Sequence, residues 1–247
     1  MTKKALLRIQ AEFLFSHTTG KAKGARRLRK GASGLAYYPI MMELGGQQCV
    51  VVGGGTVAER RTAGLLEAGA RVRVVSPALT DTLSRWAAVG QIEYWGKRYE
   101  TQDAADAVLI IAATDCPETN RQVGEDARVR RQLVCRADRP EAGTFIVPGS
   151  VRRGRLLLSV TTGGASPGLT AAIRDELAGH YGEDYEKLTD LLAEYRMKVR
   201  EYVKDAGERQ KLLRCAAPAD WRTMLEQKGL REYSAKLQTL INGLEKH

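Results

Sequence analysis

The sequence predicts an α/β fold in which a parallel-sheet domain is followed by a small β-containing segment and a C-terminal helical domain. Three observations lead to this prediction. From Tyr37 onward, short apolar runs alternate with segments of helical periodicity, which is typical of successive β-α units. Three consecutive glycines join the first apolar run to the first helix. Strand-like runs cease after the glycine-rich stretch 161–168, and three long helical patterns follow.

Seven apolar runs are the predicted strands. They cover residues 48–53, 71–76, 92–95, 107–113, 132–137, 144–148 and 155–162, with helices falling between them. The first helix begins in the glycines and ends at Gly69, a residue type that favours helix C-termini. Residues at helical spacing mark one side of this helix, namely Val57, Ala58, Arg61, Leu65 and Leu66.

Beyond the stretch 161–168, the pattern is helical. Ser166 followed by Pro167 is a favourable N-cap and first-turn pair. The next helix has one apolar stripe, Leu169, Ala172, Ile173 and Leu177. Two further stripes are expected to form a bundle core or a subunit interface. They are Tyr185, Leu188, Leu192, Tyr195, Val199 and Tyr202, and then Leu230, Tyr233, Leu237, Leu240, Ile241 and Leu244.

The positive charge of the chain is concentrated at its beginning. The formal net charge is +10, with 39 Lys and Arg against 29 Asp and Glu. Residues 1–36 hold nine of the basic residues and one acidic residue, Glu12, so the remaining chain has 30 basic and 28 acidic residues. A folded body so close to neutral does not favour nucleic acid or a membrane surface as partner. We expect 1–36 to be a disordered extension, with an organelle-type presequence or a misassigned start as alternatives.

The cysteines and histidines indicate neither a disulfide framework nor a metal site. The four cysteines are widely spaced and form no Cys-x-x-Cys pair, and the three histidines form no ligand motif. We therefore expect a cytoplasmic protein in a reducing compartment, with no resident metal. No apolar run approaches the length of about 20 residues that a membrane span needs.

The glycine turn at 53–58, GGGTVA, fits the pattern G-x-G-x-x-G/A in the required strand–turn–helix context. Glycines permit a close backbone approach, and the free N–H groups at the helix start attract a diphosphate. The turn therefore predicts a Rossmann-like dinucleotide site, although a sharp strand-to-helix turn alone also explains three glycines. The second strand ends at Ser76 and Pro77, where an acidic residue would ordinarily hold the ribose. The fingerprint alone thus leaves NAD and NADP open.

Further candidates follow the ends of later strands. Asp138 lies at the carboxyl edge expected for a ligand site, and its alternative is a turn aspartate before Arg139 and Pro140. Thr114 and Asp115 could line the same crevice, the alternative being a helix N-cap at Asp115. The stretch 161–168, TTGGASPG, suits substrate carboxylates or a capped turn. Arginines that could bind carboxylates lie nearby in sequence, but none stands out: Arg136, Arg152, Arg153 and Arg155.

Several of these motifs, in the same order, resemble the precorrin-2 dehydrogenase family of siroheme synthesis, which also forms the N-terminal module of siroheme synthase. The resemblance rests on YPIMMELGGQQCVVVGGGTVAERRTAGLLEAGARVRVVSP (38–77), LIIAATDCPETN (109–120) and VCRADRPEAGTFIVPGSVRRGRLLLSVTTGGASPGLTAAIRDEL (134–177), with GERQKLLR (207–214) resembling a later family segment.

The resemblance implies a homodimeric oxidoreductase of tetrapyrrole (porphyrin-type) biosynthesis that uses NAD to convert precorrin-2 to sirohydrochlorin. Some members are also lyases that insert ferrous iron into sirohydrochlorin, which the sequence leaves open. By resemblance, Asp138 is the catalytic base. The cofactor-contacting positions are Gly53, Gly54, Gly55, Thr56, Val57, Ser76, Pro77, Thr114 and Asp115, and the substrate-side positions are Thr162, Gly163, Gly164 and Ser166.

We accordingly expect four segments: the basic extension 1–36, an NAD-binding Rossmann domain at 37–148, a dimerisation and substrate segment at 149–178, and a helical domain at 179–247. Two other functions stay open at this point. One is a non-catalytic NAD-sensing regulatory module, since such modules share the opening VVVGGG. The other is a chelatase-only member of the same family.

Overall fold

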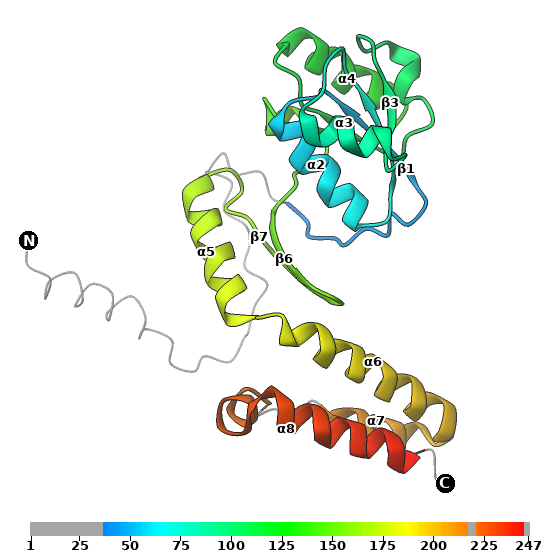
Figure 1. The fold of residues 1–247 in the computed structure, drawn as a ribbon, viewed down its shortest axis with the longest axis vertical. Helices are drawn as coiled ribbons and strands as arrows, with labels where there is room; N and C mark the ends of the chain where they lie inside the picture. The colour runs from blue at the N-terminus through cyan, green and yellow to red at the C-terminus, as the bar shows by residue number, and fades with distance from the viewer. Residues whose placement is uncertain (1–36, 217–220, 245–247) are drawn as a thin grey trace, which may run out of the picture. The chain divides into compact units, whose positions relative to one another are not determined.

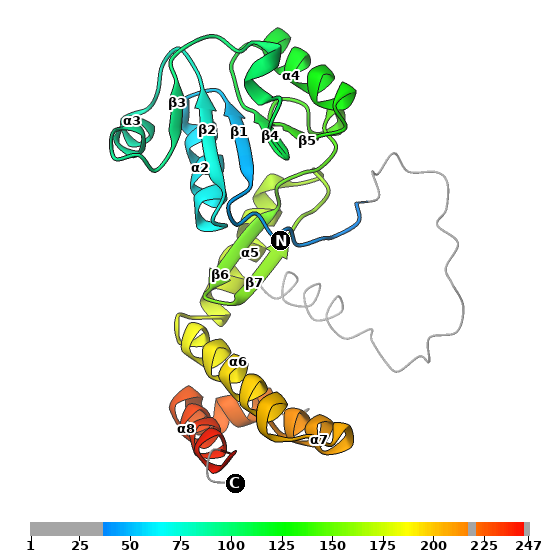
Figure 2. The same ribbon diagram turned by 90° about the vertical axis from the view of Figure 1, so that its right-hand side faces the viewer.

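The computed structural model describes residues 37–216 and 221–244. The expectation of a disordered extension at 1–36 lies outside the described residues. Five parallel strands form one sheet in the order β3-β2-β1-β4-β5, which Figure 2 shows side by side. They are β1 (Gln48–Val52), β2 (Arg71–Val75), β3 (Glu93–Trp95), β4 (Leu109–Ala112) and β5 (Leu133–Arg136). The helices between them are α2 (Thr56–Glu67), α3 (Asp81–Ala88), the 3-10 turn η1 (Thr101–Ala104) and α4 (Pro117–Val129).

The sheet order reverses beside its central strand. β1 pairs in parallel with β2 on one side and with β4 on the other, so that Val51 faces Val74 and Ile111 in the two registers. The chain thus builds outward to β3, returns across the sheet, and continues with β4 and β5. In parallel sheets, the crevice at such a reversal, outside the carboxyl ends of the strands, is the usual ligand site. The loops after β1 and β4 therefore meet where a dinucleotide is expected.

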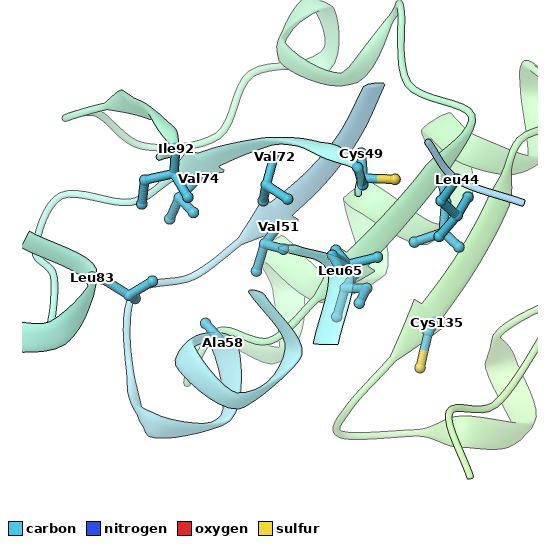
Figure 3. Close-up of a cluster of buried hydrophobic side chains, with 13 residues drawn as sticks. Leu44, Cys49, Val51, Ala58, Leu65, Val72, Val74, Leu83, Ile92 and Cys135 are labelled. Atoms are coloured by element: carbon cyan, nitrogen blue, oxygen red, sulfur yellow. The ribbon is translucent and has the colours of Figure 1, made fainter. Parts of the chain in front are cut away.

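Both faces of the sheet are buried, which explains its unbroken valine and isoleucine runs. On one face, Val51 and Val74 pack with Ala58 and Leu65 of α2 and Leu83 of α3. Figure 3 shows these side chains together, and Figure 1 shows α2 and α3 on the same side of the sheet. On the other face, the alternate residues of the same strands pack against α4 and η1, namely Val50, Val52, Val75, Ile110, Ala112 and Val134 with Val123, Ala127 and Ala104. The α/β fold class predicted from the sequence is confirmed.

The strand predicted at 144–148 is wrong. Thr144 donates its backbone N–H to the Val134 carbonyl (2.7 Å), but its hydroxyl, rather than a backbone carbonyl, accepts from the Val134 N–H (2.9 Å). The side chain thus takes the place of the next ladder bond, and Pro148 has no N–H to donate. The segment leaves the sheet edge after the turn η2 (Pro140–Ala142) without forming a strand.

An antiparallel hairpin follows, formed by β6 (Gly149–Arg153) and β7 (Leu156–Val160). The prediction of β7 at 155–162 is confirmed, whereas β6 was not among the predicted strands. Helix α5 (Pro167–His180) packs on this hairpin (Figure 2). It begins as predicted, because the Ser166 hydroxyl accepts from the Leu169 N–H at 3.1 Å.

The C-terminal helices are α6 (Asp184–Tyr202), α7 (Ala206–Ala216) and α8 (Trp221–Leu244), of which α7 was not among the predicted patterns. The two predicted stripes supply a bundle core made of Leu188, Tyr195, Val199, Tyr233, Leu237 and Ile241. Tyr202 was predicted in the stripe but is 45% exposed, since it lies in the last turn of α6. Within the described ranges, no helix has the length and apolar character needed to cross a membrane.

Candidate active site

The glycine turn after β1 is held between two other loops. Gly53 has φ 123° and donates its N–H to the Val75 carbonyl at 2.9 Å. A Cβ on Gly53 would lie 2.2 Å from the Ala113 oxygen, and a Cβ on Gly54 would lie 1.9 Å from the Ala78 oxygen. Any side chain at either position would therefore displace the backbone of a neighbouring loop. The two glycines are needed to bring the loops after β1, β2 and β4 together.

The start of α2 offers backbone donors to a ligand. Gly55 is the N-cap residue and supplies no capping side chain, and the first helical bond runs from the Glu59 N–H to the Gly55 oxygen (2.9 Å). A Cβ on Gly55 would meet no atom within 4 Å, and both Thr56 and Val57 are exposed. The amides of the first turn and the positive end of a 12-residue helix thus face open space. These residues fit the diphosphate of a dinucleotide.

The turn after β2 carries no acidic residue at the position that usually binds a ribose. Ser76 stands there, almost fully buried, and its hydroxyl donates to the Ala78 oxygen at 2.7 Å. This bond shapes the turn that brings Ala78 against Gly54. Pro77 follows and is exposed. Because the Ser76 hydroxyl already donates to Ala78, the role of Ser76 at the crevice is to fix the loop after β2.

The loop after β4 is fixed by one buried side chain of α4. Asn120 is fully buried and makes three hydrogen bonds to Thr114. Its Oδ1 accepts from the Thr114 N–H (3.1 Å) and hydroxyl (2.8 Å), and its Nδ2 donates to the Thr114 carbonyl (2.9 Å). The alternative that Asp115 caps α4 is wrong, because the N-cap residue is Cys116. Sequence reasoning missed Asn120, although its place in the first turns of a helix behind a strand end was visible.

Asp138 follows the end of β5 and is held by an arginine of that strand. Arg136 Nε and Nη2 donate to the two carboxylate oxygens at 3.2 and 2.7 Å. These bonds and the guanidinium charge hold the pKa of the Asp138 carboxyl below its usual value, against a smaller opposing effect of burial, and a hydrogen bond from Asn120 adds to the lowering. Asp138 is therefore an ionised carboxylate at neutral pH with a fixed orientation.

The other arginines considered near the site have different partners. Arg155 pairs with Asp190 of α6 at 3.0 Å, and Arg153 donates to the Arg152 carbonyl at 2.9 Å. Although Arg153 and Arg155 lie near Arg136 in sequence, neither shares a hydrogen-bond partner with it. Among the described residues, no group of three or more His, Cys, Asp or Glu side chains is placed to hold a metal ion.

The stretch 161–168 forms a closed turn with an open tip. The Thr162 hydroxyl accepts from the Ser166 N–H at 3.0 Å, while Ser166 caps α5. Gly163 and Gly164 have φ 64° and 88°, are exposed, and would give a Cβ no neighbour within 4 Å. The two hydroxyl residues are thus used in building the turn, whereas the two glycines leave space beside their backbone.

Comparison with known proteins agrees with this geometry. Residues 40–149 match a family model described as "Putative NAD(P)-binding". The precorrin-2 dehydrogenase of Priestia megaterium is 34% identical over 176 residues, which cover 71% of this chain and 87% of that protein. The chain belongs to the precorrin-2 dehydrogenase family.

Other members of the precorrin-2 dehydrogenase family extend the likeness. A solved structure of SirC, a precorrin-2 dehydrogenase, superposes with a TM-score of 0.67 at 31% identity and covers 82% of this chain and all of that one. The siroheme synthase of Methylobacillus flagellatus is 40% identical over 172 residues, or 70% of this chain. The match spans only 37% of that siroheme synthase.

Proposed function

We propose that this protein is an NAD-dependent dehydrogenase that converts precorrin-2 to sirohydrochlorin in siroheme biosynthesis. The observation that carries the proposal is the ionised Asp138 carboxylate at the same sheet edge as the glycine turn. β1, β4 and β5 are parallel neighbours, so Gly53, Thr114 and Asp138 each follow the carboxyl end of an adjacent strand. Membership of the precorrin-2 dehydrogenase family supports the choice of substrate.

The cofactor would be held mainly by backbone. The N–H groups at Gly55, Thr56 and Val57 would bind the diphosphate, and the turns at 76–77 and 114–115 would enclose the two ends of the nucleotide. Once bound, oxidised nicotinamide supplies the hydride acceptor. Position 76 holds a serine where an acidic residue is usual, which is compatible with either NAD or NADP. The choice of NAD rests on the resemblance to the family.

Asp138 would accept the proton that leaves the macrocycle as the hydride is removed. Its carboxylate needs no prior deprotonation, because Arg136 keeps it ionised. A low-pKa carboxylate is a weak base, so its contribution depends on position: the proton must be within hydrogen-bond reach of a fixed oxygen. The bidentate contact with Arg136 supplies that fixed orientation.

The substrate carboxylates would meet the turn at 161–168. Thr162 and Ser166 keep this turn closed, and the exposed backbone at Gly163 and Gly164 lets a carboxylate approach closely. We assign 37–148 to nucleotide binding, 149–178 to substrate binding and dimerisation, and 179–247 to a helical domain.

We also infer a homodimer. Helix α5 has 14 residues and none of them is buried within one chain, although it carries an apolar stripe. Leu169 on this helix is 52% exposed, and Tyr38, Ile40 and Met41 before β1 are 65% exposed or more. Exposed apolar surface of this kind is typical of a face covered by a second subunit. Cys49 and Cys135 are free and buried, which suits a reducing cytoplasm.

The test is oxidation of precorrin-2 by the purified protein with NAD, followed by NADH absorbance and the sirohydrochlorin spectrum. Asp138→Ala is expected to lower kcat by about 100-fold or more, as expected for loss of a general base, while leaving the Kd for NAD near normal. The matched control is Asp190→Ala, which removes an aspartate that also pairs with an arginine but lies on α6. It should retain turnover.

Three outcomes would contradict the proposal. Full activity of Asp138→Ala would remove the assigned base. A wild-type protein that binds NAD but leaves precorrin-2 unchanged would indicate the regulatory module instead. Calorimetry that detects neither NAD nor NADP at millimolar concentration would remove the oxidoreductase assignment altogether.

A further inference from the structure

Arg136 is almost completely buried although it lies beside a ligand site. Its side chain is 9% exposed, and that of Asp138 is 24% exposed. Burial of a guanidinium is unfavourable unless a partner compensates the lost hydration. The compensation here is Asp138, which receives both hydrogen bonds from one side of the guanidinium. The pair is thus built into the sheet edge and differs from the exposed ion pairs on the surface.

The helix beside β5 makes room for this arginine. Gly124 is buried within α4, where glycine is an unfavourable helix former. A Cβ at Gly124 would lie 3.3 Å from Arg136 Cδ. A larger residue would therefore crowd the arginine stem. The interior glycine and the buried arginine are complementary, which indicates that the position of Arg136 is fixed from two sides.

We propose that Arg136 is a positioning residue for dehydrogenation, whose guanidinium fixes the charge and the direction of the Asp138 carboxylate that receives the proton. The inference rests on the proposed function. The two-pronged edge formed by Nε and Nη2 is not open to a substrate carboxylate, because Asp138 uses both donors and the side chain is buried. Arginine stays protonated across the accessible pH range, so this charge is permanent.

Asn120 ties the same carboxylate to the nucleotide side of the crevice. It makes three hydrogen bonds to Thr114 in the loop after β4, and its interaction with Asp138 contributes to the low pKa of that carboxyl. One buried residue of α4 therefore fixes the proposed cofactor loop and also favours the charged form of the proposed base. Arg136 and Asn120 approach Asp138 from β5 and α4 respectively.

The remaining charged groups around β5 are bonded elsewhere or exposed. On α4, Arg121 binds Glu118 and Glu125, Asp126 accepts from the Tyr99 hydroxyl, and Arg128 donates to the Ala142 carbonyl. β4 has no charged residue. Asp115, Arg139 and Glu141 are exposed. The electrostatic effect of Arg136 on Asp138 is thus the one to test.

The test compares Arg136→Met and Arg136→Lys with wild type. Met removes the charge and keeps an unbranched stem, whereas Lys keeps the charge but cannot form the two-pronged contact. The matched control is Arg121→Met, which removes an arginine paired with two carboxylates on the exposed side of α4. Melting temperatures report whether each variant folds.

Two readouts are used. The first is a carbon-13 NMR titration of the Asp138 carboxyl, assigned with Asp138→Asn. In Arg136→Met the pKa should rise toward the ordinary aspartate value of 3.8, and in Arg136→Lys it should rise less. The second is the pH profile of kcat/KM. Because the reaction needs the carboxylate, a higher pKa moves the acidic limb of the profile to higher pH.

At neutral pH, Arg136→Met should lose about 10- to 100-fold in kcat through misorientation of the base, with the KM for NAD unchanged. An Asp138 pKa and kcat that are the same in wild type and Arg136→Met would overturn the inference. If Arg136→Met does not fold, the same comparison is made with Arg136→Lys, for which wild-type values of both quantities would overturn it. Failure of the proposed function is distinguishable, because it appears as an inactive wild type.

Discussion

A substitution at Gly55 distinguishes an effect on fold stability from an effect on nucleotide binding. It has an ordinary φ of −86°, and a Cβ there would meet nothing within 4 Å. Gly55→Ala is therefore expected to cost only about 0.5–1 kcal/mol in unfolding free energy, since alanine is a poorer N-cap than glycine. The added methyl group would occupy the space in which the diphosphate is proposed to bind. We expect the Kd for NAD, measured by calorimetry, to rise about tenfold or more.

The same helix offers a control. Gly64 is an exposed interior residue of α2, and a Cβ there also meets nothing within 4 Å. Gly64→Ala should stabilise the protein by about 0.5–1 kcal/mol through helix propensity and leave the Kd for NAD unchanged. Wild-type affinity in Gly55→Ala would show that the diphosphate does not bind at the start of α2.

Residue types that create a backbone shape were predictable, whereas residues that hold a side chain in place were not. The need for glycine at position 53 follows from the glycine pattern, whereas the close approach at Gly54, an unspecified position of that pattern, does not. The roles of Asn120 and Arg136 depend on contacts with the loops after β4 and β5, Asn120 with Thr114 and Arg136 with Asp138, and the sequence pattern does not give these contacts. Arg136 was grouped with other arginines by sequence position, yet its partner, Asp138, lies two residues further along, just after the end of the same strand.

The start of α5 shows how one hydroxyl stabilises an element. Ser166 Oγ accepts from the Leu169 N–H, and Thr162 Oγ1 holds the preceding turn closed. Ser166→Ala is expected to lower the unfolding free energy by about 1 kcal/mol, the usual cost of losing an N-cap. Urea denaturation measures this change. Ser159→Ala, at an exposed position of β7, serves as control and should change stability by less than about 0.5 kcal/mol. Equal stability of the two variants would show that the cap contributes nothing.

Elements buried on both sides were predicted best. β1, β2 and β4 are continuous apolar runs between two helical layers, and their positions were correct within a few residues. The run at 144–148 has a similar composition but follows the edge of the sheet, where the Thr144 hydroxyl ends the ladder. The hairpin strand β6, GSVRR, has little apolar character because it is only half covered within one chain. The apolar content of a segment therefore predicts its burial better than it predicts whether the segment pairs as a strand.

At the scale of the whole molecule, the distribution of charge and of apolar surface indicates which partners the chain accepts. Residues 1–36 carry a net charge of +8, and the remainder is nearly balanced. Association through residues 37–247 is therefore not governed by net charge. Among the described residues, the exposed large apolar side chains form one run before β1, namely Tyr37, Tyr38, Ile40, Met41 and Met42, and α5 adds Leu169. The proposed homodimer would cover these surfaces.

The proposed homodimer gives the last prediction. Leu169→Glu places a charge on the exposed apolar side of α5, so it should shift the protein from dimer to monomer in sedimentation velocity at micromolar concentration, because burying an unpaired carboxylate at an interface is unfavourable. Val129→Glu is the control, since Val129 is 84% exposed at the end of α4 and belongs to neither of the proposed interface segments. Its sedimentation should match that of wild type. A Leu169→Glu protein that remains dimeric, or a wild type that is monomeric throughout, would contradict the assignment of α5 to the subunit interface.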